Sequence, residues 1–324
     1  MTDILALTPE NIARAAEVLR NGGLVAFPTE TVYGIGADAT NDSAVARIFE
    51  AKNRPTFNPL IITTTDATAA QAFARISADD ARVLKNFWPG PLSAILPRAE
   101  NSLISRLASA GLDTLAVRVP ADANAQALLN AAGVPVAAPS ANSSGKISPT
   151  TAAHVARDLD GKIDIILDGG PCAVGVESTI LDLTTNPPTI LRHGGVTYEA
   201  IKEALGVSPI ISAPEESDQH GDHDASNPPI APGMMRSHYA PSIPVRLNAR
   251  HAEPGEALLG FGPTQGASET LSAQGDLTEA AARLFECLHR LDDGRFTGVA
   301  VAPIPEEGLG RAINDRLRRA AAPK

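Results

Sequence analysis

Short apolar runs alternate along the chain with longer segments in which apolar residues recur every three or four positions. The short runs predict β-strands, and the longer segments predict amphipathic α-helices. Strands are expected at residues 23–27, 59–63, 93–96, 114–119, 134–138, 163–167, 178–183 and 189–192. Helices are expected near residues 9–21, 43–51, 66–74, 79–86 and 150–159, with a longer one near 276–292. This alternation is typical of an α/β layer fold.

The predicted strand at residues 114–119 carries an arginine within its apolar pattern. The alternation places Arg118 and Thr114 on one face and the large apolar residues on the other. A guanidinium on the face of a sheet usually has a carboxylate or phosphate partner. Either an ion pair within the protein or an anionic ligand can supply that partner.

A short apolar strand runs into a serine-rich loop that precedes the helix expected at residues 150–159. Ser148 is expected to be the N-cap of this helix, and Pro149 its first residue. Backbone N–H groups at the start of a helix attract anions, so we expect a phosphate to lie beside Ser140 and Asn142. A serine-rich turn without a ligand is the alternative.

Residues 28–34 form a polar segment directly after the first predicted strand. If this segment is extended, Thr29, Thr31 and Tyr33 share one face. Three hydroxyl groups on one face indicate a polar binding surface.

Cations stand at the ends of two other predicted elements. Lys52 and Arg54 follow a helix that the next proline terminates, and Arg192 ends a strand that leads to Gly194 and Gly195. The two glycines allow a backbone or a ligand to approach closely. An ordinary charged helix end is the alternative for the first pair.

The glycine-rich stretch after the strand at 163–167 is not a P-loop. Gly170 and Gly175 have the glycine spacing of that motif, but Val176 and Glu177 stand where it needs Lys and then Ser or Thr. The chain also continues as a strand, whereas a P-loop leads into a helix.

The composition favours two domains, because 324 residues exceed one average domain and 44% hydrophobic residues can fill two cores. Residues 213–229 are acidic, proline-rich and without apolar periodicity, so they read as a flexible linker. His220 and His223 could ligate a metal there together with Asp222 and Asp224, but a solvated acidic tract is the commoner explanation. No metal site is therefore assigned.

The two cysteines, Cys172 and Cys287, support neither a disulfide framework nor a zinc ribbon, which fits a reducing cytoplasm. The first residues lack a signal peptide, and no apolar run reaches about 18 residues, so no membrane partner is expected. A net charge of −10 argues against stable binding to nucleic acid.

The ordered motifs together resemble the Sua5/YrdC family of threonylcarbamoyl-AMP synthases, nucleotidyltransferases that begin the N6-threonylcarbamoyladenosine modification of tRNA. The resemblance rests on PTETVYG (28–34), KNRPTFNPL (52–60), WPGPLS (88–93), AVRVP (116–120), APSANSSGKISPT (138–150), GVESTI (175–180) and LRHGG (191–195). Residues 232–241 look like the segment that joins the synthase domain to a C-terminal Sua5 domain, and the stretch after Gly308 looks like that domain's terminal helix. The longer, two-domain branch is therefore indicated.

The resemblance implies a twisted, mixed, open sheet with a concave cavity in a YrdC-like domain, followed by a smaller C-terminal α/β Sua5 domain. The expected boundaries are residues 1–204 for the synthase domain, 205–243 for a linker covering the active site, and 244–324 for the Sua5 domain.

The implied reaction converts L-threonine, bicarbonate or carbon dioxide, and ATP into L-threonylcarbamoyladenylate and pyrophosphate, with Mg²⁺ on the phosphates. A transient encounter with the complex that transfers the threonylcarbamoyl group to tRNA is also implied. Such chemistry needs positioned cations and hydroxyls and no covalent intermediate, which agrees with the absence of a nucleophile with His and Asp partners.

The family's functional positions carry over residue by residue. Lys52 and Arg54 are the expected catalytic residues, because they would neutralise phosphates. The expected ATP-binding residues are Lys52, Arg54, Asn58, Thr114, Ser140, Asn142, Ser148, Arg192 and Tyr239. The expected threonine-binding residues are Thr31, Tyr33, Thr63, Arg118, Ala138 (through its carbonyl) and Ser178. Thr63 departs from many relatives, which carry a histidine there, so an acid–base role at this position is in doubt.

Two other classes remain open: a carbamoyltransferase of the hydrogenase-maturation type and a non-enzymatic RNA- or ribosome-binding factor. The first would add an acylphosphatase-like region and cysteine-rich zinc motifs, which two lone cysteines exclude. The second would need a basic face, but residues 1–200 carry 15 Lys and Arg against 20 Asp and Glu.

Overall fold

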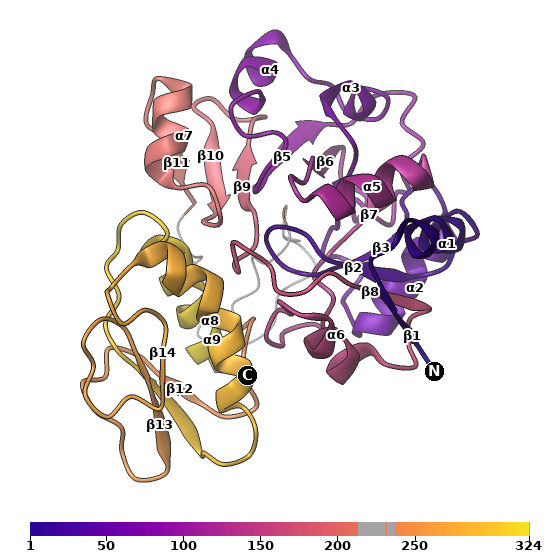
Figure 1. Ribbon diagram of the computed structural model, residues 1–324. Coiled ribbons are helices and arrows are strands. Elements are labelled where there is room, and N and C mark those ends of the chain that lie inside the picture. The colour runs from indigo at the N-terminus through magenta and orange to yellow at the C-terminus, as the bar shows by residue number, and fades with distance from the viewer. Residues whose placement is uncertain (213–230, 232–236, 324) are drawn as a thin grey trace.

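A large mixed sheet forms the frame of the first domain in the computed structural model, which describes residues 1–212, 231 and 237–323 (Figure 1). Within these residues the sheet has 11 strands in the order β1-β8-β2-β3-β7-β4-β6-β5-β9-β10-β11. The strands are β1 (Asp3–Ala6), β2 (Val25–Phe27), β3 (Gly34–Asp38), β4 (Ile61–Thr63), β5 (Leu92–Pro97), β6 (Thr114–Arg118), β7 (Val136–Ala137), β8 (Ile165–Asp168), β9 (Thr179–Asp182), β10 (Thr189–Arg192) and β11 (Ile210–Ile211). Parallel pairs such as β4–β6 and antiparallel pairs such as β5–β6 both occur, which confirms the mixed α/β fold expected from the sequence.

Helices cover both faces of this sheet. They are α1 (Pro9–Arg20), α2 (Asp42–Lys52), α3 (Ala67–Ala70), α4 (Ala78–Leu84), α5 (Ala123–Ala132), α6 (Ala152–Leu159) and α7 (Tyr198–Leu205). Successive residues of a strand point to opposite faces. Val25 and Phe27 of β2 accordingly pack with α1 and α5, whereas Ala26 joins the cluster that contains α2 and α6.

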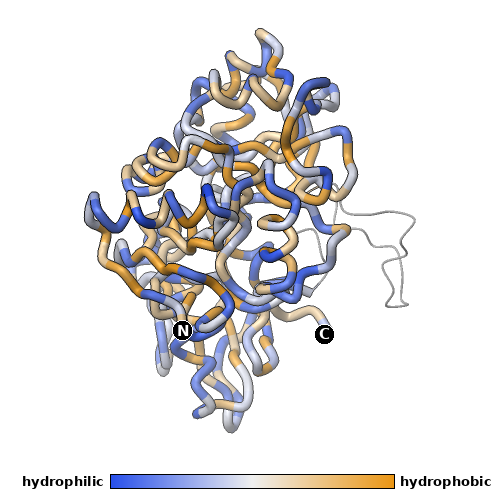
Figure 2. Tube along the Cα trace, turned by 90° about the vertical axis from the view of Figure 1, so that its right-hand side faces the viewer, coloured by the Kyte–Doolittle hydropathy of each residue, from blue (hydrophilic) through white to orange (hydrophobic). Residues whose placement is uncertain are grey.

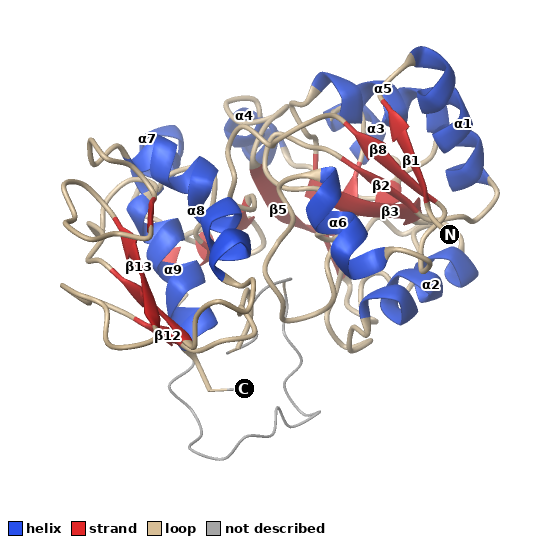
Figure 3. Cartoon of the chain, turned by 60° about the horizontal axis from the view of Figure 1, so that its bottom comes forward, coloured by secondary structure: helices blue, strands red, loops and turns tan. Residues whose placement is uncertain are grey.

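A second, smaller sheet follows in the chain. Its strands are β12 (Val245–Arg246), β13 (Glu256–Gly260), β14 (Glu269–Thr270) and β15 (Gly298–Val301), and they pair in parallel in the order β12-β15-β13-β14. Helices α8 (Leu277–Leu291) and α9 (Gly310–Ala321) lie between this sheet and the first domain (Figures 1 and 3).

One apolar cluster spans both domains. Phe285 of α8 and Ile313 of α9 are fully buried in the same cluster as Val32, Ile147 and Val176 of the first domain. The loop at Gly175 approaches so closely that a Cβ there would lie 2.4 Å from the Cα atom of Ala282 in α8. The second domain is therefore packed directly onto the loops at residues 32, 147 and 176.

Hydropathy follows this arrangement, since apolar segments run through the interior and polar segments follow the outer sides of the helices (Figure 2). Within the described ranges, no helix is both long and apolar enough to cross a membrane.

The expected helix start at Ser148 and Pro149 is wrong. Helix α6 begins at Ala152, and Thr151 is its N-cap, with the side chain accepting a hydrogen bond from the His154 backbone. The Pro149 carbonyl instead accepts a hydrogen bond from Tyr33 N at 2.9 Å, and the Ser148 hydroxyl donates to Glu177. These tertiary contacts hold residues 148–150 outside the helix, so α6 does not present an anion site at Ser148.

Other boundaries also differ. Residues 28–33 of the expected extended segment (28–34) form a loop between antiparallel β2 and β3, and β3 was not anticipated. Strand β11 lies within the expected linker at 205–243 but pairs with β10 of the large sheet. The remainder of that linker, including His220, His223, Asp222 and Asp224, falls largely outside the described residues.

Candidate active site

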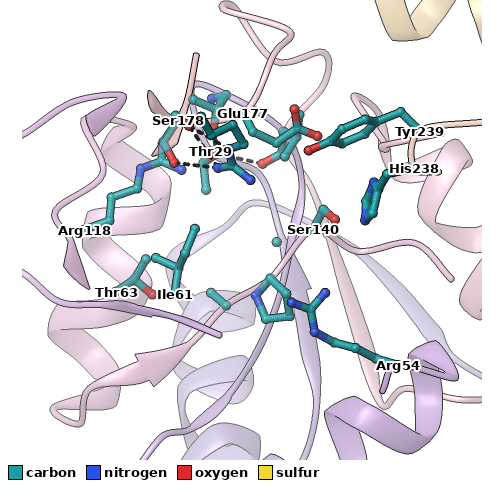
Figure 4. A pocket seen from close by; sticks show the side chains of 16 residues that line it. Thr29, Arg54, Ile61, Thr63, Arg118, Ser140, Glu177, Ser178, His238 and Tyr239 are labelled. Carbon is teal, nitrogen blue, oxygen red and sulfur yellow. Dashed lines mark hydrogen bonds between the residues drawn. The ribbon is translucent and has the colours of Figure 1, made fainter. Parts of the chain in front are cut away.

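A pocket opens where several loops of the first domain meet the segment that leads into the second (Figure 4). Its lining residues are Thr29, Thr31, Val32, Gly34, Arg54, Ile61, Thr63, Arg118, Ala138, Pro139, Ser140, Glu177, Ser178, Arg192, His238 and Tyr239. Residues from eight separate stretches of the chain therefore meet in one cavity. In the close-up, Arg118 and Thr63 lie toward one side, whereas Arg54, His238 and Tyr239 lie toward the other.

Arg54 reaches the pocket because the chain turns sharply at the end of α2. Asn53 has a left-handed backbone, with φ of 48°, and caps the helix. The Arg54 Nε atom donates to the Asn58 carbonyl at 3.2 Å, and its Nη2 atom donates to the Pro59 carbonyl at 2.8 Å. Burial lowers the pKa of Arg54 to about 10, so the guanidinium remains cationic at neutral pH.

Arg192, at the end of β10, fixes the backbone beside the pocket. Its Nε and Nη2 atoms donate to the Ser178 carbonyl at 3.1 and 2.9 Å, and Nη2 also lies 3.2 Å from the Ser178 hydroxyl oxygen. That hydroxyl lies 2.8 Å from the Ser93 hydroxyl oxygen. Ser178 is thus held from two sides.

Arg118 is paired with a carboxylate of the protein. Its Nη2 atom donates to Glu30 Oε1 at 2.6 Å, and its Nε atom donates to the Gly90 carbonyl at 3.4 Å. Burial tends to raise the pKa of Glu30, but the charge and hydrogen bond of Arg118 outweigh it and hold that pKa below its usual value. The ion pair that the sequence left open is therefore present, and Arg118 lines the pocket as well.

Threonine hydroxyls line the wall near Arg118. The Thr29 and Thr31 hydroxyl oxygens lie 2.8 Å apart, and Thr29 also bonds the Val32 carbonyl at 2.7 Å. Thr63 donates its proton to the Val136 carbonyl at 2.8 Å, so toward a ligand this hydroxyl can act only as an acceptor.

Glu177 is a lining residue that the sequence did not single out as part of a site. One of its oxygens accepts the Ser148 hydroxyl, and the other accepts Arg316 Nε of α9 at 2.7 Å. Burial alone would raise the pKa of Glu177, but Arg316 and Arg192 more than compensate and leave it below its usual value. Arg316 lies 139 positions away, so no local pattern could reveal this pair.

The segment at His238 and Tyr239 covers one side of the cavity. Tyr239 is 1% exposed and has a left-handed backbone, with φ of 62°, an uncommon conformation for a bulky residue. Its ring lies 4.1 Å from the His238 ring and 5.8 Å from the Phe285 ring, measured between centroids. The ring is therefore fixed by contacts with the second domain.

Nine of the residues expected from the sequence line the pocket, namely Arg54, Ser140, Arg192, Tyr239, Thr31, Thr63, Arg118, Ala138 and Ser178. Lys52 does not. It is 1% exposed, and its Nζ atom donates to the Ser140 and Asn142 carbonyls. Lys52 thus supports the loop of Ser140 from behind.

Asn58, Asn142 and Ser148 also lie behind the lining. Asn58 accepts from Arg54 through its carbonyl, and the Asn142 amide donates to the Ser143 and Lys146 carbonyls. Ser148 contacts the lining residue Glu177.

Thr114 and Tyr33 are not part of the pocket lining. Thr114 begins β6 and Arg118 ends it, so the two are about 13 Å apart along the strand. The Tyr33 hydroxyl donates to the Gly170 carbonyl at 2.8 Å and accepts from Gly169 N at 3.1 Å. Its ring belongs to the core of the first domain.

Comparison with known proteins agrees with this architecture. Residues 17–194 match the Sua5/YciO/YrdC family model, described as "Telomere recombination". Residues 196–322 match the model of the threonylcarbamoyl-AMP synthase C-terminal domain.

Curated relatives match over nearly the whole chain. Threonylcarbamoyl-AMP synthase of Bacillus subtilis (strain 168) is 40% identical over 99% of this chain and 96% of its own. The synthase of Pyrococcus abyssi (strain GE5 / Orsay) is 42% identical over 95% of this chain and 93% of its own. The crystal structure of P. abyssi Sua5 complexed with L-threonine superposes with a TM-score of 0.88 at 39% identity, covering 99% of this chain and 97% of that one. This chain therefore belongs to the two-domain Sua5 family of threonylcarbamoyl-AMP synthases.

Proposed function

We propose that this chain makes L-threonylcarbamoyladenylate and pyrophosphate from L-threonine, bicarbonate or carbon dioxide, and ATP. The observation that carries this proposal is a single pocket that combines three arginines with threonine and serine hydroxyls, in a chain that matches synthases over its full length. Fixed cations of this kind stabilise charge on phosphates and carboxylates without a covalent intermediate.

The side of the pocket at Arg118 suits the amino acid. A guanidinium can bind a carboxylate through two parallel N–H donors. Arg118 uses Nη2 for Glu30, and no hydrogen bond of Nη1 is found within the described residues. We assign the threonine carboxylate to Arg118, and its polar groups to Thr31, Thr63, Ser178 and the Ala138 carbonyl. The relative crystallised with L-threonine supports threonine as the amino acid.

The opposite side of the pocket suits the nucleotide. Arg54 and Arg192 supply positive charge, Ser140 supplies polar groups, and Tyr239 forms a wall. Lys52 keeps the Ser140 loop in place through two carbonyl contacts, so its role is to position that loop.

Mg²⁺ enters with ATP as part of the substrate. Over residues 1–212 and 237–323, no group of three or more His, Cys, Asp or Glu side chains is arranged to hold a metal ion. The phosphate oxygens of ATP would therefore provide most of the ligands of the Mg²⁺ ion in place of protein side chains, and the ion would neutralise their negative charge.

The chemistry then consists of two bond-forming steps. The neutral threonine nitrogen attacks the carbon of carbon dioxide, a proton passes from the nitrogen to solvent water or bicarbonate, and a carbamate forms. A carbamate oxygen next attacks the α-phosphorus of ATP, the bond from that phosphorus to the bridging oxygen breaks, and pyrophosphate leaves. The pocket accelerates both steps by holding the reactants together and by neutralising the phosphates.

The product is a mixed anhydride of a carbamate and a phosphate, which water cleaves readily. The ring of Tyr239 would restrict water at the nucleotide side of the cavity. A transient encounter with the complex that transfers the threonylcarbamoyl group to tRNA follows from this lability and belongs to the proposal.

The test is pyrophosphate release from MgATP with bicarbonate, in the presence of L-threonine, L-serine or L-alanine. Release that depends on both threonine and bicarbonate, with threonylcarbamoyl-AMP identified by mass spectrometry, supports the synthase. Release without threonine, or none, refutes it and returns a carbamoyltransferase or an RNA-binding factor to consideration.

A further inference from the structure

Among the described residues that line the pocket, Glu177 is the only one with an acidic side chain. It lies in the same cavity as Arg54 and Arg192, which we assign to the phosphates. An ionised carboxylate in a site for a triphosphate repels the ligand unless a cation balances it. Its charge therefore needs an explanation.

One cation that balances this charge comes from the second domain. Arg316 of α9 is 0% exposed and donates from Nε to Glu177 Oε2 at 2.7 Å. Its Nη1 atom donates to the His193 carbonyl at 2.8 Å and to Asp315 at 2.6 Å. Both Glu177 oxygens accept hydrogen bonds, the other from the Ser148 hydroxyl, and the pKa of Glu177 lies below its usual value, so this side chain is held as an anion.

The same helix contacts the covering segment. The Arg316 guanidinium lies over the Tyr239 ring, 5.0 Å from its centroid, and the His238 backbone N–H donates to the Arg319 carbonyl at 3.2 Å. Helix α9 thus contacts the pocket wall at Glu177 and also at His238 and Tyr239.

The position of Glu177 is also coupled to Ser178. A Cβ on Gly194 would lie 2.3 Å from the Glu177 carbonyl oxygen and 2.4 Å from the Ser178 carbonyl carbon, so Gly194 packs directly against this backbone. Displacement of Glu177 would therefore shift Ser178, which Arg192 binds.

A purely structural ion pair is a weak reason for burying two charges. Desolvation of both groups offsets most of their attraction, and an apolar pair of similar size is often as stable. The location of the pair at the pocket wall suggests a different role.

We propose that Arg316 is a positioning residue of the nucleotide site, which neutralises Glu177 so that the pocket can accept the triphosphate. The second domain then contributes to ATP binding through α9. This inference rests on the proposed function, because it takes ATP as the ligand.

Charge rescue tests the proposal: nucleotide binding that is lost when Arg316 is replaced should return when the charge of Glu177 is removed as well. The variants are Arg316→Met, Glu177→Gln and the double variant, with Arg318→Met as the matched control on the same helix, since Arg318 is half exposed and pairs with Glu306 at the surface. Binding of a non-hydrolysable ATP analogue with Mg²⁺ is measured by calorimetry, KM values come from pyrophosphate release, and thermal melting monitors the fold.

Arg316→Met is expected to weaken nucleotide binding by on the order of 10- to 100-fold, the effect of one unbalanced charge at an effective dielectric constant of about 20. The threonine KM should stay within about threefold. The double variant should regain nucleotide affinity to within about threefold of wild type, and Arg318→Met should not change it. If the double variant binds the nucleotide as poorly as Arg316→Met, the role of Arg316 is structural and the proposal is overturned.

The pH dependence gives a second readout. Arg316 from α9, Arg192 from β10 and the Ser148 hydroxyl face the Glu177 carboxyl, while Tyr239 and Asp315 lie beside Arg316. In wild type, Glu177 stays ionised from pH 8 to pH 6. In Arg316→Met, burial still favours the neutral form of Glu177, while Arg192 and the Ser148 hydroxyl still favour the ionised form, so the pKa of Glu177 should rise relative to wild type. Protonation of Glu177 at lower pH weakens the repulsion, so the ratio of variant to wild-type dissociation constants should not increase as the pH falls; a ratio that increases refutes the charge argument.

Failure of this inference differs from failure of the proposed function. If wild type binds the analogue but releases no pyrophosphate with threonine, the proposed function fails while charge rescue can still hold. If wild type is active and charge rescue fails, only the role of Arg316 is lost.

Discussion

Replacing Arg118 by methionine is expected to abolish most threonine binding and to leave ATP binding nearly unchanged. Methionine keeps much of the side-chain volume but removes every donor. Charge-assisted hydrogen bonds contribute about 1.5–3 kcal/mol each, so two bonds to a carboxylate, counted at the lower value, give about 3 kcal/mol. That corresponds to a rise of about 150-fold in the threonine KM.

The same substitution has a second effect, because Arg118 also neutralises Glu30. The two side chains are only 8% and 12% exposed, and breaking a buried pair from one side costs about 3–5 kcal/mol of unfolding free energy. Glu30→Gln together with Arg118→Met removes both charges. The double variant should regain most of the lost stability but none of the threonine affinity.

Threonine titration by calorimetry, pyrophosphate release and thermal melting separate these two effects. The ATP KM serves as the internal control for an intact nucleotide site. A folded Arg118→Met variant whose threonine KM lies within threefold of wild type would refute the assignment. Recovery of threonine affinity in the double variant would show that Arg118 acts only through Glu30.

Three further substitutions test individual contacts. Thr151→Ala removes the N-cap of α6 and should cost about 1 kcal/mol, or about 2–4 °C in Tm, without changing KM; an unchanged Tm would contradict this cap. Gly194→Ala places a Cβ 2.3 Å from the Glu177 carbonyl oxygen, so it should lower the melting temperature and reduce threonine-dependent pyrophosphate release at least about tenfold. Wild-type values of both quantities would show that the loop adapts to the added methyl group. Thr63→Val removes the hydrogen bond to the Val136 carbonyl, which should cost about 1 kcal/mol by denaturant unfolding. It also removes the acceptor that we assign to threonine, so the threonine KM should rise by about fivefold, and an unchanged threonine KM would contradict that contact.

Local patterns predicted most of the elements, because alternation and helical periodicity depend on near neighbours. They also predicted polar residues at the ends of elements, such as Arg54 and Arg192, which line the pocket. Alternation predicts on which face of a strand a side chain lies, but it does not predict which positions along the strand reach the pocket. Thr114 and Arg118 share a face of β6, yet they lie at its opposite ends.

Tertiary contacts account for the remaining differences. Ser148 has the residue type of an N-cap, but its hydroxyl donates to Glu177, and Thr151 caps α6 instead. Lys52 has the charge expected of a phosphate ligand, but its ammonium group is buried against two carbonyls. Neither outcome can be read from neighbouring residues, because the partners come from other parts of the chain.

The ion pair between Glu177 and Arg316 joins residues that are 139 positions apart. Ribosomes add about 5–20 residues per second, so roughly 7–28 s separate the synthesis of the two side chains. During that interval the nascent first domain exposes Val32, Ile147 and Val176, which α8 and α9 later cover. Arg54 and Arg192 have then been synthesised, whereas Arg316, which bonds Glu177, has not. The nucleotide site is therefore completed late in translation, and a chain that stops before α9 carries an unbalanced and partly uncovered pocket.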